Sequence, residues 1–205
     1  EIKPDRALEM VHPGQIPSMG NTVYLTVIDK DGNACSLMNS IYRGFGTGLV
    51  VPETGILLHC RGALFSLDPN HPNALAPGKR TFHTIIPSMV TQNDHLVMSF
   101  GVMGALQQAQ AQLQVLSNMF DFDMEPQQAL NALRYRTNPG QATAIEEGIS
   151  NEVQVELAKR GHDLTLVTGD RRILFGKGQI IARNPETGTL TAGTEPRSDG
   201  IAIGW

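Results

Sequence analysis

Two hydroxyl side chains near the start of the chain have the types and the setting for nucleophilic chemistry. Thr22 opens a stretch of alternating side chains, residues 22–28, that is typical of a β-strand, and Ser40 follows the stretch expected to return beside it. A threonine hydroxyl attacks a carbonyl carbon once a base takes its proton. If the chain is cut before Thr22, the freed α-amine, with a reference pKa of about 7.7 to 8.0, can be that base. The alternative interpretation is an ordinary strand threonine, since β-branched residues favour strands.

The segments around these hydroxyls predict a hairpin followed by a tight loop. Residues 29–33, DKDGN, supply the positive φ angles that a turn between strands at 22–28 and 34–39 requires. The glycines of GFGTG at 44–48 allow the backbone to turn or to approach another group closely. Two further short strands are expected at 49–51 and 56–58.

A glycine-rich turn offers backbone groups that could serve the same chemistry. Strands are expected at 85–90 and 95–100, followed by GVMGA at 101–105 and a helix at 106–120. Such a turn presents free backbone N–H groups at a helix N-terminus, which is a ready anion site. A phosphate-binding loop would need a following Gly-Lys-Ser/Thr, which this sequence lacks here.

The remaining elements are helices and then short strands. Later helices are expected at 126–134 and 151–160, the second with Ser150 as its N-cap and with Val153 and Leu157 buried. Strands are expected at 164–167, 173–175, 179–182 and 201–203. The apolar face expected for the 106–120 helix consists of Leu106, Ala109, Leu113, Leu116 and Phe120. This order predicts an α+β fold with a large sheet.

Composition excludes several classes of function. The 205 residues carry a formal net charge of −4 without a basic block, which argues against a nucleic-acid partner. No apolar run reaches the length of about 18 residues that predicts a membrane segment. Prolines bracket the single Asp-x-x-His pair at 68–71, so neither a metal nor an organic cofactor is expected. Cys35 and Cys60 are expected to be buried free thiols, and Arg197 and Asp199 to lock loops together.

Several motifs in a fixed order resemble the small subunit of the γ-glutamyltranspeptidase family. They are DKDGN at 29–33, FGTG at 45–48, TGILL at 54–58, PGKR at 77–80 and EPRS at 195–198. The stretches FSLDPNHPNALAPGKR at 65–80 and HTIIP at 83–87 are similar to a divergent branch of that family, with γ-glutamyltransferase-like proteins and cephalosporin (glutaryl) acylases. The resemblance covers residues 22–205.

The resemblance implies a precursor that cuts itself between Asn21 and Thr22. Residues 1–21 would then be the C-terminal arm of a large subunit, and residues 22–205 the small-subunit catalytic domain. The implied fold is the αββα sandwich of N-terminal nucleophile hydrolases, completed by the large subunit from the same precursor. The implied assembly is this heterodimer, alone or as a dimer of heterodimers. The compartment stays open between the cytoplasm and the periplasm or exterior.

The resemblance also assigns roles to individual residues. Thr22 would be the nucleophile, and Ser40 the second hydroxyl residue that hydrogen-bonds its amine. Gly104 and Ala105 would form the oxyanion hole, on the condition that φ is negative at Ala105.

The expected substrate pocket departs from the family's pattern. Transpeptidases hold the α-amine and α-carboxylate of the γ-glutamyl group with an asparagine and an acidic pair, and the matching positions here are Tyr42, Ala63 and Leu64. Leu64 cannot accept a hydrogen bond from an ammonium. Arg61 replaces a neutral or acidic residue, and its guanidinium suits a carboxylate, although it could equally face solvent or the missing subunit. We therefore expect an acyl group with a distal carboxylate and no α-amine, such as glutaryl.

Two functions remain open from the sequence. The first is a threonine amidohydrolase or acyltransferase that moves a γ-glutamyl or glutaryl-type acyl group through a Thr22 acyl-enzyme, from small substrates such as glutathione or glutaryl amides. In it, His83 and Thr84 stand where the family has two serines that bind the substrate carboxylate. The second is a non-catalytic, unprocessed relative that acts as a binding or subunit protein.

Overall fold

Two antiparallel strands form the hairpin that the sequence predicts around Thr22. In the computed structural model, which describes residues 22–137, 140 and 142–205, β1 (Thr22–Ile28) pairs with β2 (Ala34–Ser40). The turn is closed by Asp29, whose carboxylate accepts hydrogen bonds from the backbone N–H of Asp31 and of Asn33. This register places Thr22 directly opposite Ser40 at the open end of the hairpin. Residues 1–21, with the expected arm and Asn21, lie outside the described residues.

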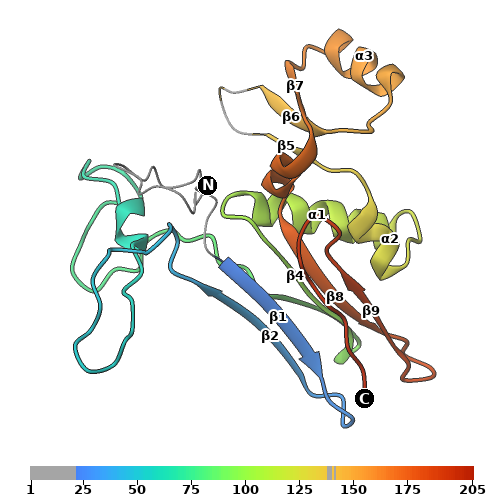
Figure 1. The fold of residues 1–205 in the computed structure, drawn as a ribbon, viewed down its shortest axis with the longest axis horizontal. Helices are drawn as coiled ribbons and strands as arrows, with labels where there is room; N and C mark the ends of the chain where they lie inside the picture. Colours follow the sequence, from blue (N-terminus) through green and yellow to red (C-terminus); the bar gives the residue numbers. More distant parts are fainter. Residues whose placement is uncertain (1–21, 138–139, 141) are drawn as a thin grey trace, which may run out of the picture.

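A four-stranded antiparallel sheet lies against this hairpin. Its strands are β3 (Ser88–Gln92), β4 (His95–Met103), β8 (Lys177–Arg183) and β9 (Leu190–Thr194), in the order β3-β4-β8-β9. The helices α1 (Gln107–Phe120) and α2 (Pro126–Asn131) pack on the sheet (Figure 1). A small third sheet of β5 (Tyr135–Arg136), β6 (Thr143–Glu146) and β7 (Leu164–Val167) carries α3 (Asn151–Lys159). The predicted α+β class is therefore confirmed.

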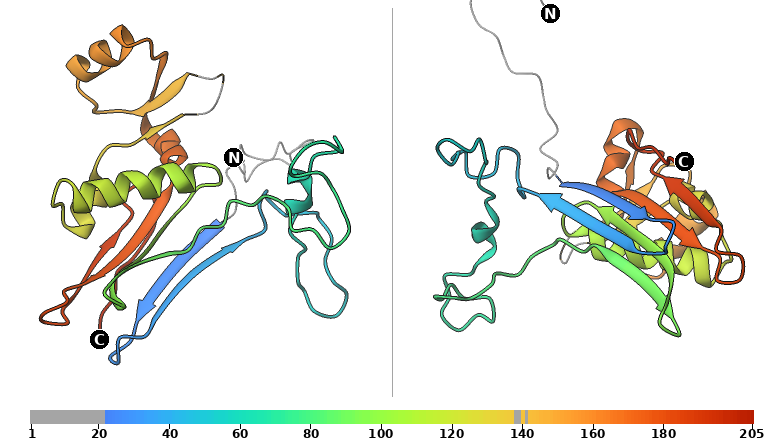
Figure 2. Two further views of the ribbon diagram at one scale, coloured as in Figure 1. Left: turned by 180° about the vertical axis from the view of Figure 1, so that it is seen from behind. Right: turned by 90° about the horizontal axis from the view of Figure 1, so that it is seen from below.

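Strand β4 separates the helices from the hairpin because its alternate side chains point to opposite faces. The side chains of Met98, Phe100 and Val102 are buried in the core with α1 and α2. Ser99 points the other way, and its hydroxyl lies 2.6 Å from that of Thr26 on β1. The three layers, helices, sheet and hairpin, can be followed in Figure 2.

The contact between the hairpin and the sheet depends on a glycine. A Cβ placed on Gly101 would lie 2.7 Å from the ring of Tyr24, so only glycine lets the two layers approach this closely. The Tyr24 hydroxyl bonds that of Ser36 at 2.7 Å, and burial raises the pKa of Tyr24. Tyr24 thus faces Gly101, and Thr26 faces Ser99. These two contacts define how β1 is aligned with β4 across the layers.

A Gly101→Val variant should therefore be less stable by about 1 to 3 kcal/mol, because the added methyl groups overlap the Tyr24 ring. Urea unfolding of the full-length protein measures the loss. Gly204→Val is the matched control, since a Cβ at Gly204 meets nothing within 4 Å. Equal stability of the two variants would contradict this account of the packing.

The face that α1 buries differs from the predicted one. The buried side chains are Gln107, Gln108, Ala111, Gln112 and Val115. The glutamines are accommodated because they bond the backbone: Gln108 Oε1 accepts from Ile86 N–H, and Gln112 Nε2 donates to the Ile86 carbonyl. The expected apolar face is instead largely exposed, with Leu113 63% and Phe120 52% exposed. Likewise, α3 buries no side chain, although Ser150 caps it as predicted.

Several smaller predictions were wrong. Residues 49–51 and 56–58 form only an isolated bridge between Val50 and Leu57, and 173–175 lies in a 3-10 helix, η2 (Gly169–Phe175). Residues 201–203 form no strand, whereas β6 and β9 were not predicted. Both cysteines are free, but Cys35 is exposed and Cys60 is half-buried, because Cys35 lies on the outer face of the hairpin.

A buried ion cluster ties the C-terminal strands to α2 and β6. Glu195 accepts from Arg134 Nη1 at 3.1 Å and from Arg197 Nη1 at 2.7 Å, and Arg197 Nη2 lies 2.6 Å from Glu146. The four side chains are at most 1% exposed. Arg197 thus locks loops together as predicted, whereas Asp199 is exposed. No helix within the described ranges is long and apolar enough to cross a membrane.

Candidate active site

The hairpin register brings the two candidate hydroxyls together. Thr22 is 4% exposed, and its Oγ1 donates to Ser40 Oγ at 2.8 Å. The two residues are the last pair of the β1–β2 ladder, so their side chains leave the same face of the hairpin. A buried threonine hydroxyl therefore lies beside a hydrogen-bonding partner; the bond to the Thr22 amine that the resemblance implies for Ser40 stays a prediction.

Arg61 reaches this pair from the 3-10 helix η1 (Arg61–Leu64). Its Nη2 donates to Ser40 Oγ at 2.8 Å, and its Nη1 donates to Thr84 Oγ1 at 3.1 Å. The side chain is only 6% exposed, so it does not face solvent in this chain. Burial lowers the pKa of the Arg61 guanidinium from its ordinary value.

The guanidinium of Arg61 has no anionic partner among residues 22–137, 140 and 142–205. Its described hydrogen bonds go to neutral hydroxyls, and its Nε is buried without an acceptor. A buried cation without a counter-ion is unfavourable by several kcal/mol, so such an arrangement suits a site that receives an anion.

Tyr42 shapes the other side of the site. Its backbone has φ +76°, in the left-handed region, and its N–H donates to Ser40 Oγ at 3.0 Å. This turn places the Tyr42 ring beneath two guanidiniums, with its centroid 5.2 Å from Arg61 Cζ and 5.6 Å from Arg43 Cζ. Such cation–π contacts hold a guanidinium plane in place. From the sequence, Tyr42 was assigned to the substrate pocket only through the family resemblance. The local signal that could have indicated it is a tyrosine next to an arginine, two residues after Ser40.

The glycine-rich turn follows the end of β4 as expected. The register between β1 and β4 puts Thr22 level with Met103, the residue before Gly104. However, Ala105 has φ +53°, which contradicts the condition of a negative φ there. A non-glycine residue in this region is strained by about 1 to 2 kcal/mol, and such strain clusters at functional sites.

The Gly104–Ala105 turn packs against Gly176, which in turn is bonded to the buried ion cluster. A Cβ on Gly104 would lie 3.2 Å from the Gly176 Cα, so the two backbones touch. The Gly176 carbonyl in turn accepts from Arg134 Nη1 at 3.0 Å. The Arg134–Glu195 ion cluster is thereby connected to the Gly104 turn through Gly176. No feature of the sequence had indicated a role for Gly176.

Two other candidate residues lie differently from Arg61 and Thr84. His83 is exposed, and its Nδ1 accepts from the Ile85 N–H, whereas Thr84 is buried on Arg61. Leu64 is half-buried, and its carbonyl accepts from Asn73 Nδ2. The structure thus gathers Thr22, Ser40, Tyr42, Arg61 and Thr84, and does not place His83 or the Leu64 side chain in that group.

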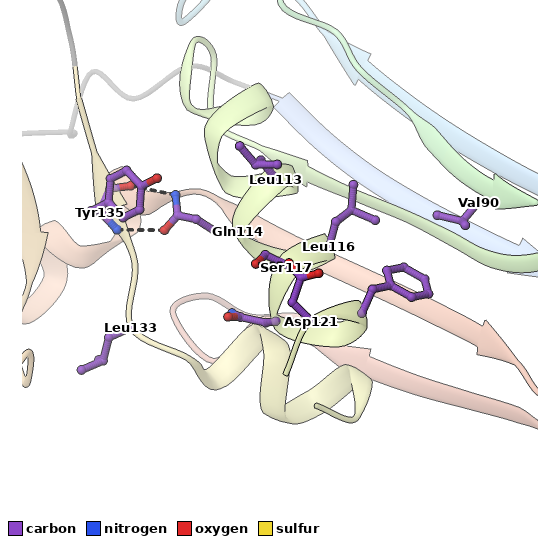
Figure 3. A pocket seen from close by; sticks show the side chains of 10 residues that line it. Val90, Leu113, Gln114, Leu116, Ser117, Asp121, Leu133 and Tyr135 are labelled. Atoms are coloured by element: carbon purple, nitrogen blue, oxygen red, sulfur yellow. Dashed lines mark hydrogen bonds between the residues drawn. The ribbon is translucent and has the colours of Figure 1, made fainter. Parts of the chain in front are cut away.

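A hollow lined by other residues lies away from this group. It is a groove of about 740 Å³ along the exposed side of α1, and Leu113, Leu116, Leu133 and Tyr135 are among the side chains that line it (Figure 3). Gln114 bonds both backbone groups of Tyr135 there. The groove has neither a candidate nucleophile of the hairpin nor an arginine in its lining.

Comparisons with known proteins identify the family. The protein-family model described as "Gamma-glutamyltranspeptidase" matches residues 1–205 of the chain. The chain is 39% identical over 92% of its length to the "Glutathione hydrolase-like YwrD proenzyme" of Bacillus subtilis (strain 168), and 38% identical over 91% to the "Oxamate amidohydrolase proenzyme" of Klebsiella pneumoniae. The crystal structure of cephalosporin acylase from Bacillus halodurans superposes with a TM-score of 0.84 at 48% identity, covering 89% of this chain and 34% of that one.

The chain belongs to the gamma-glutamyltranspeptidase family, and its α+β fold is of the N-terminal nucleophile hydrolase type, as predicted. It spans 36% of the length of each of the two curated relatives named above.

Proposed function

We propose that this chain carries the catalytic part of a threonine amidohydrolase or acyltransferase that is released by cleavage between Asn21 and Thr22. The observation that carries the proposal is the buried Thr22 hydroxyl, bonded to Ser40 beside a buried arginine that has no counter-ion among the described residues. Two relatives named above are called proenzymes, which supports synthesis as a precursor.

The reaction follows from the groups around Thr22. After cleavage, the neutral α-amine of Thr22 accepts the proton of its own hydroxyl, and Oγ1 attacks the amide carbonyl. The developing oxyanion is held by the backbone N–H of Gly104, whereas Ala105, with φ +53°, is not assigned this role. Collapse breaks the C–N bond, and the α-amine returns its proton to the leaving amine. Water or a second amine then attacks the Thr22 ester and releases the acyl group.

The buried charge of Arg61 selects the acyl group. A guanidinium binds a carboxylate through two parallel hydrogen bonds, and Thr84 lies next to it as a further donor. No described carboxylate contacts this cluster, so nothing there would balance an ammonium. We propose an acyl group that bears a carboxylate and lacks an α-amine, such as glutaryl. Oxamate, named for the Klebsiella relative, also has a carboxylate and no ammonium.

The rest of the precursor would cover the apolar outer face of the hairpin. Val23, Leu25 and Val27 on β1 and Leu37 on β2 are between 45% and 63% exposed there. An exposed apolar stripe on a strand indicates a missing layer. We propose that a large subunit from the same precursor adds the second helical layer of the αββα sandwich.

The donor preference tests the substrate proposal. Glutaryl p-nitroanilide should be hydrolysed with a higher kcat/KM than γ-glutamyl p-nitroanilide by the processed full-length protein. Arg61→Met should lower kcat/KM for the glutaryl anilide about 10- to 100-fold, because a charged hydrogen-bond pair is lost. Butyryl p-nitroanilide, which lacks the carboxylate, is the control substrate. At about pH 9.5, above the reference α-amine pKa of about 7.7 to 8.0, it should be hydrolysed equally by both proteins. A preference for the γ-glutamyl donor well above one would refute the proposed pocket.

A further inference from the structure

We propose that Arg61 has a second role: its positive charge keeps the α-amine of processed Thr22 neutral, and so ready to act as a base near neutral pH. This inference rests on the proposed function, because only cleavage before Thr22 creates that amine. It differs from the carboxylate-binding role, because it concerns the enzyme before substrate binds.

The geometry places the two cationic groups close together. Thr22 Oγ1 and Arg61 Nη2 both bond Ser40 Oγ at 2.8 Å, and a Thr22 amine would lie two bonds from the carbon that carries Oγ1. Oγ1 and Nη2 are therefore at most about 5.6 Å apart (2.8 Å plus 2.8 Å), and the amine on the same residue is close enough for the guanidinium charge to shift its pKa. Both groups are shielded from water, since Thr22 is 4% and Arg61 is 6% exposed. Burial weakens solvent screening and strengthens the repulsion.

The other charged and titratable groups near Thr22 do not offset this charge. In the part of the chain that the structure describes, the titratable side chains on the segments around Thr22 and Arg61 are those of Tyr24, Tyr42, Arg43, His59, Cys60 and His83. None is a carboxylate, and Arg43, which is exposed, adds a second positive charge 5.6 Å from the centroid of the Tyr42 ring. Tyr42 holds the Arg61 guanidinium in position by stacking.

The direction of the effect is fixed by electrostatics. A neighbouring cation disfavours the ammonium form, so the pKa of the Thr22 amine should lie below its reference of about 7.7 to 8.0. The amine acts as a base only when it is neutral. The acid limb of the kcat/KM profile should therefore lie at a lower pH than the reference pKa of an α-amine. A bound carboxylate neutralises Arg61 and should bring the amine back toward its reference value. The acid limb of kcat should therefore lie at higher pH than that of kcat/KM.

Competitive labelling of the processed full-length protein measures the amine directly. Trace acetic anhydride is applied over a range of pH that brackets about 7.7, and acetylation of the peptide that begins at Thr22 is followed by mass spectrometry. Arg61→Gln should raise the amine pKa by about one unit or more. Arg61→Lys keeps the charge and should leave it near the wild-type value, while its KM for a glutaryl anilide rises because the fork geometry is lost.

Arg43→Gln is the matched control, since it removes the same charge from an exposed arginine that also lies over the Tyr42 ring, whereas the bond to Ser40 comes from Arg61. Its amine pKa should stay close to that of wild type. An unchanged pKa in processed Arg61→Gln would overturn the inference and leave the proposed function intact. Absence of any chain that begins at Thr22 would instead overturn both.

If Arg61→Gln does not fold or process, the wild-type protein still decides the question. Glutarate, added at increasing concentration, should raise the labelled amine pKa by neutralising Arg61, whereas the uncharged glutaramide should not. A pKa that responds to neither compound, or to both alike, would overturn the inference.

Discussion

A Thr22→Ala variant of the full-length protein is expected to remain one uncut polypeptide and to lose amide hydrolysis by at least about 10³-fold. The variant lacks Thr22 Oγ1, the proposed nucleophile, which is the hydroxyl bonded to Ser40 at the end of the hairpin. The structural loss is small, because the hydroxyl makes one described hydrogen bond, worth about 1 kcal/mol. Intact-mass spectrometry and N-terminal sequencing measure cleavage, and anilide hydrolysis measures activity.

Two further variants separate chemistry from packing. Thr22→Ser retains a hydroxyl and should still be cut and active at a reduced rate. Thr26→Ala is the matched control on the same strand: it loses the 2.6 Å contact to Ser99 but should be processed and active. Wild-type protein should yield a fragment that begins Thr-Val-Tyr-Leu. A folded wild-type precursor that stays whole would favour the non-catalytic relative, and cleavage of Thr22→Ala at the same bond would contradict the nucleophile assignment.

A Glu146→Gln variant is expected to be less stable by about 3 to 5 kcal/mol at neutral pH. The Glu146 carboxylate is fully buried and accepts hydrogen bonds from three arginines: from the Arg197 and Arg172 side chains at 2.6 to 2.7 Å and from the Arg134 N–H at 2.9 Å. Replacing it by a neutral amide leaves buried guanidinium charge uncompensated. Urea unfolding measures the change, and Glu156→Gln, which removes an exposed carboxylate of α3, should cost no more than about 0.5 kcal/mol.

The same carboxylate makes stability depend on pH. Burial by itself raises the pKa of Glu146, but the hydrogen bonds from Arg197, Arg134 and Arg172 outweigh it and hold the pKa below the ordinary value of 4.5. Glu146 therefore stabilises the fold above pH 4.5, and this contribution is lost as pH falls through the folded-state pKa. Acidification below 4.5 should destabilise the wild type more than Glu146→Gln. Parallel pH dependences of the two proteins would contradict this role.

Local structure was largely predictable from the sequence. Alternation over residues 22–28 and 34–39 with DKDGN between them determines a hairpin and its register, and the register alone puts Thr22 opposite Ser40. The helix starts were also encoded locally: Ser150 caps α3, and the glycine-rich turn precedes α1. These features depend on neighbours within a few residues, so a short window of sequence contains the forces that determine them.

Only the tertiary structure decided which faces meet. The apolar residues of α1 suggested one buried face, yet the chain buries Gln108 and Gln112 against the backbone of Ile86 and leaves Leu113 exposed. Periodicity identifies an apolar face but does not say whether this chain or another one covers it. The left-handed backbone of Ala105 was likewise decided by packing around the Gly104–Gly176 contact, not by the residue's own preference.

The contacts around Ser40 were the part of the candidate site that the sequence predicted least. Thr22, Arg61 and Thr84 come from three segments, and their order along the chain contains no sign that one guanidinium would join Ser40 to Thr84. The sequence by itself determined that a threonine begins a strand beside a serine and that an arginine stands in an unusual position. The tertiary structure decided that this arginine is buried next to the threonine, because long-range packing determines which side chains meet and which are shielded from water.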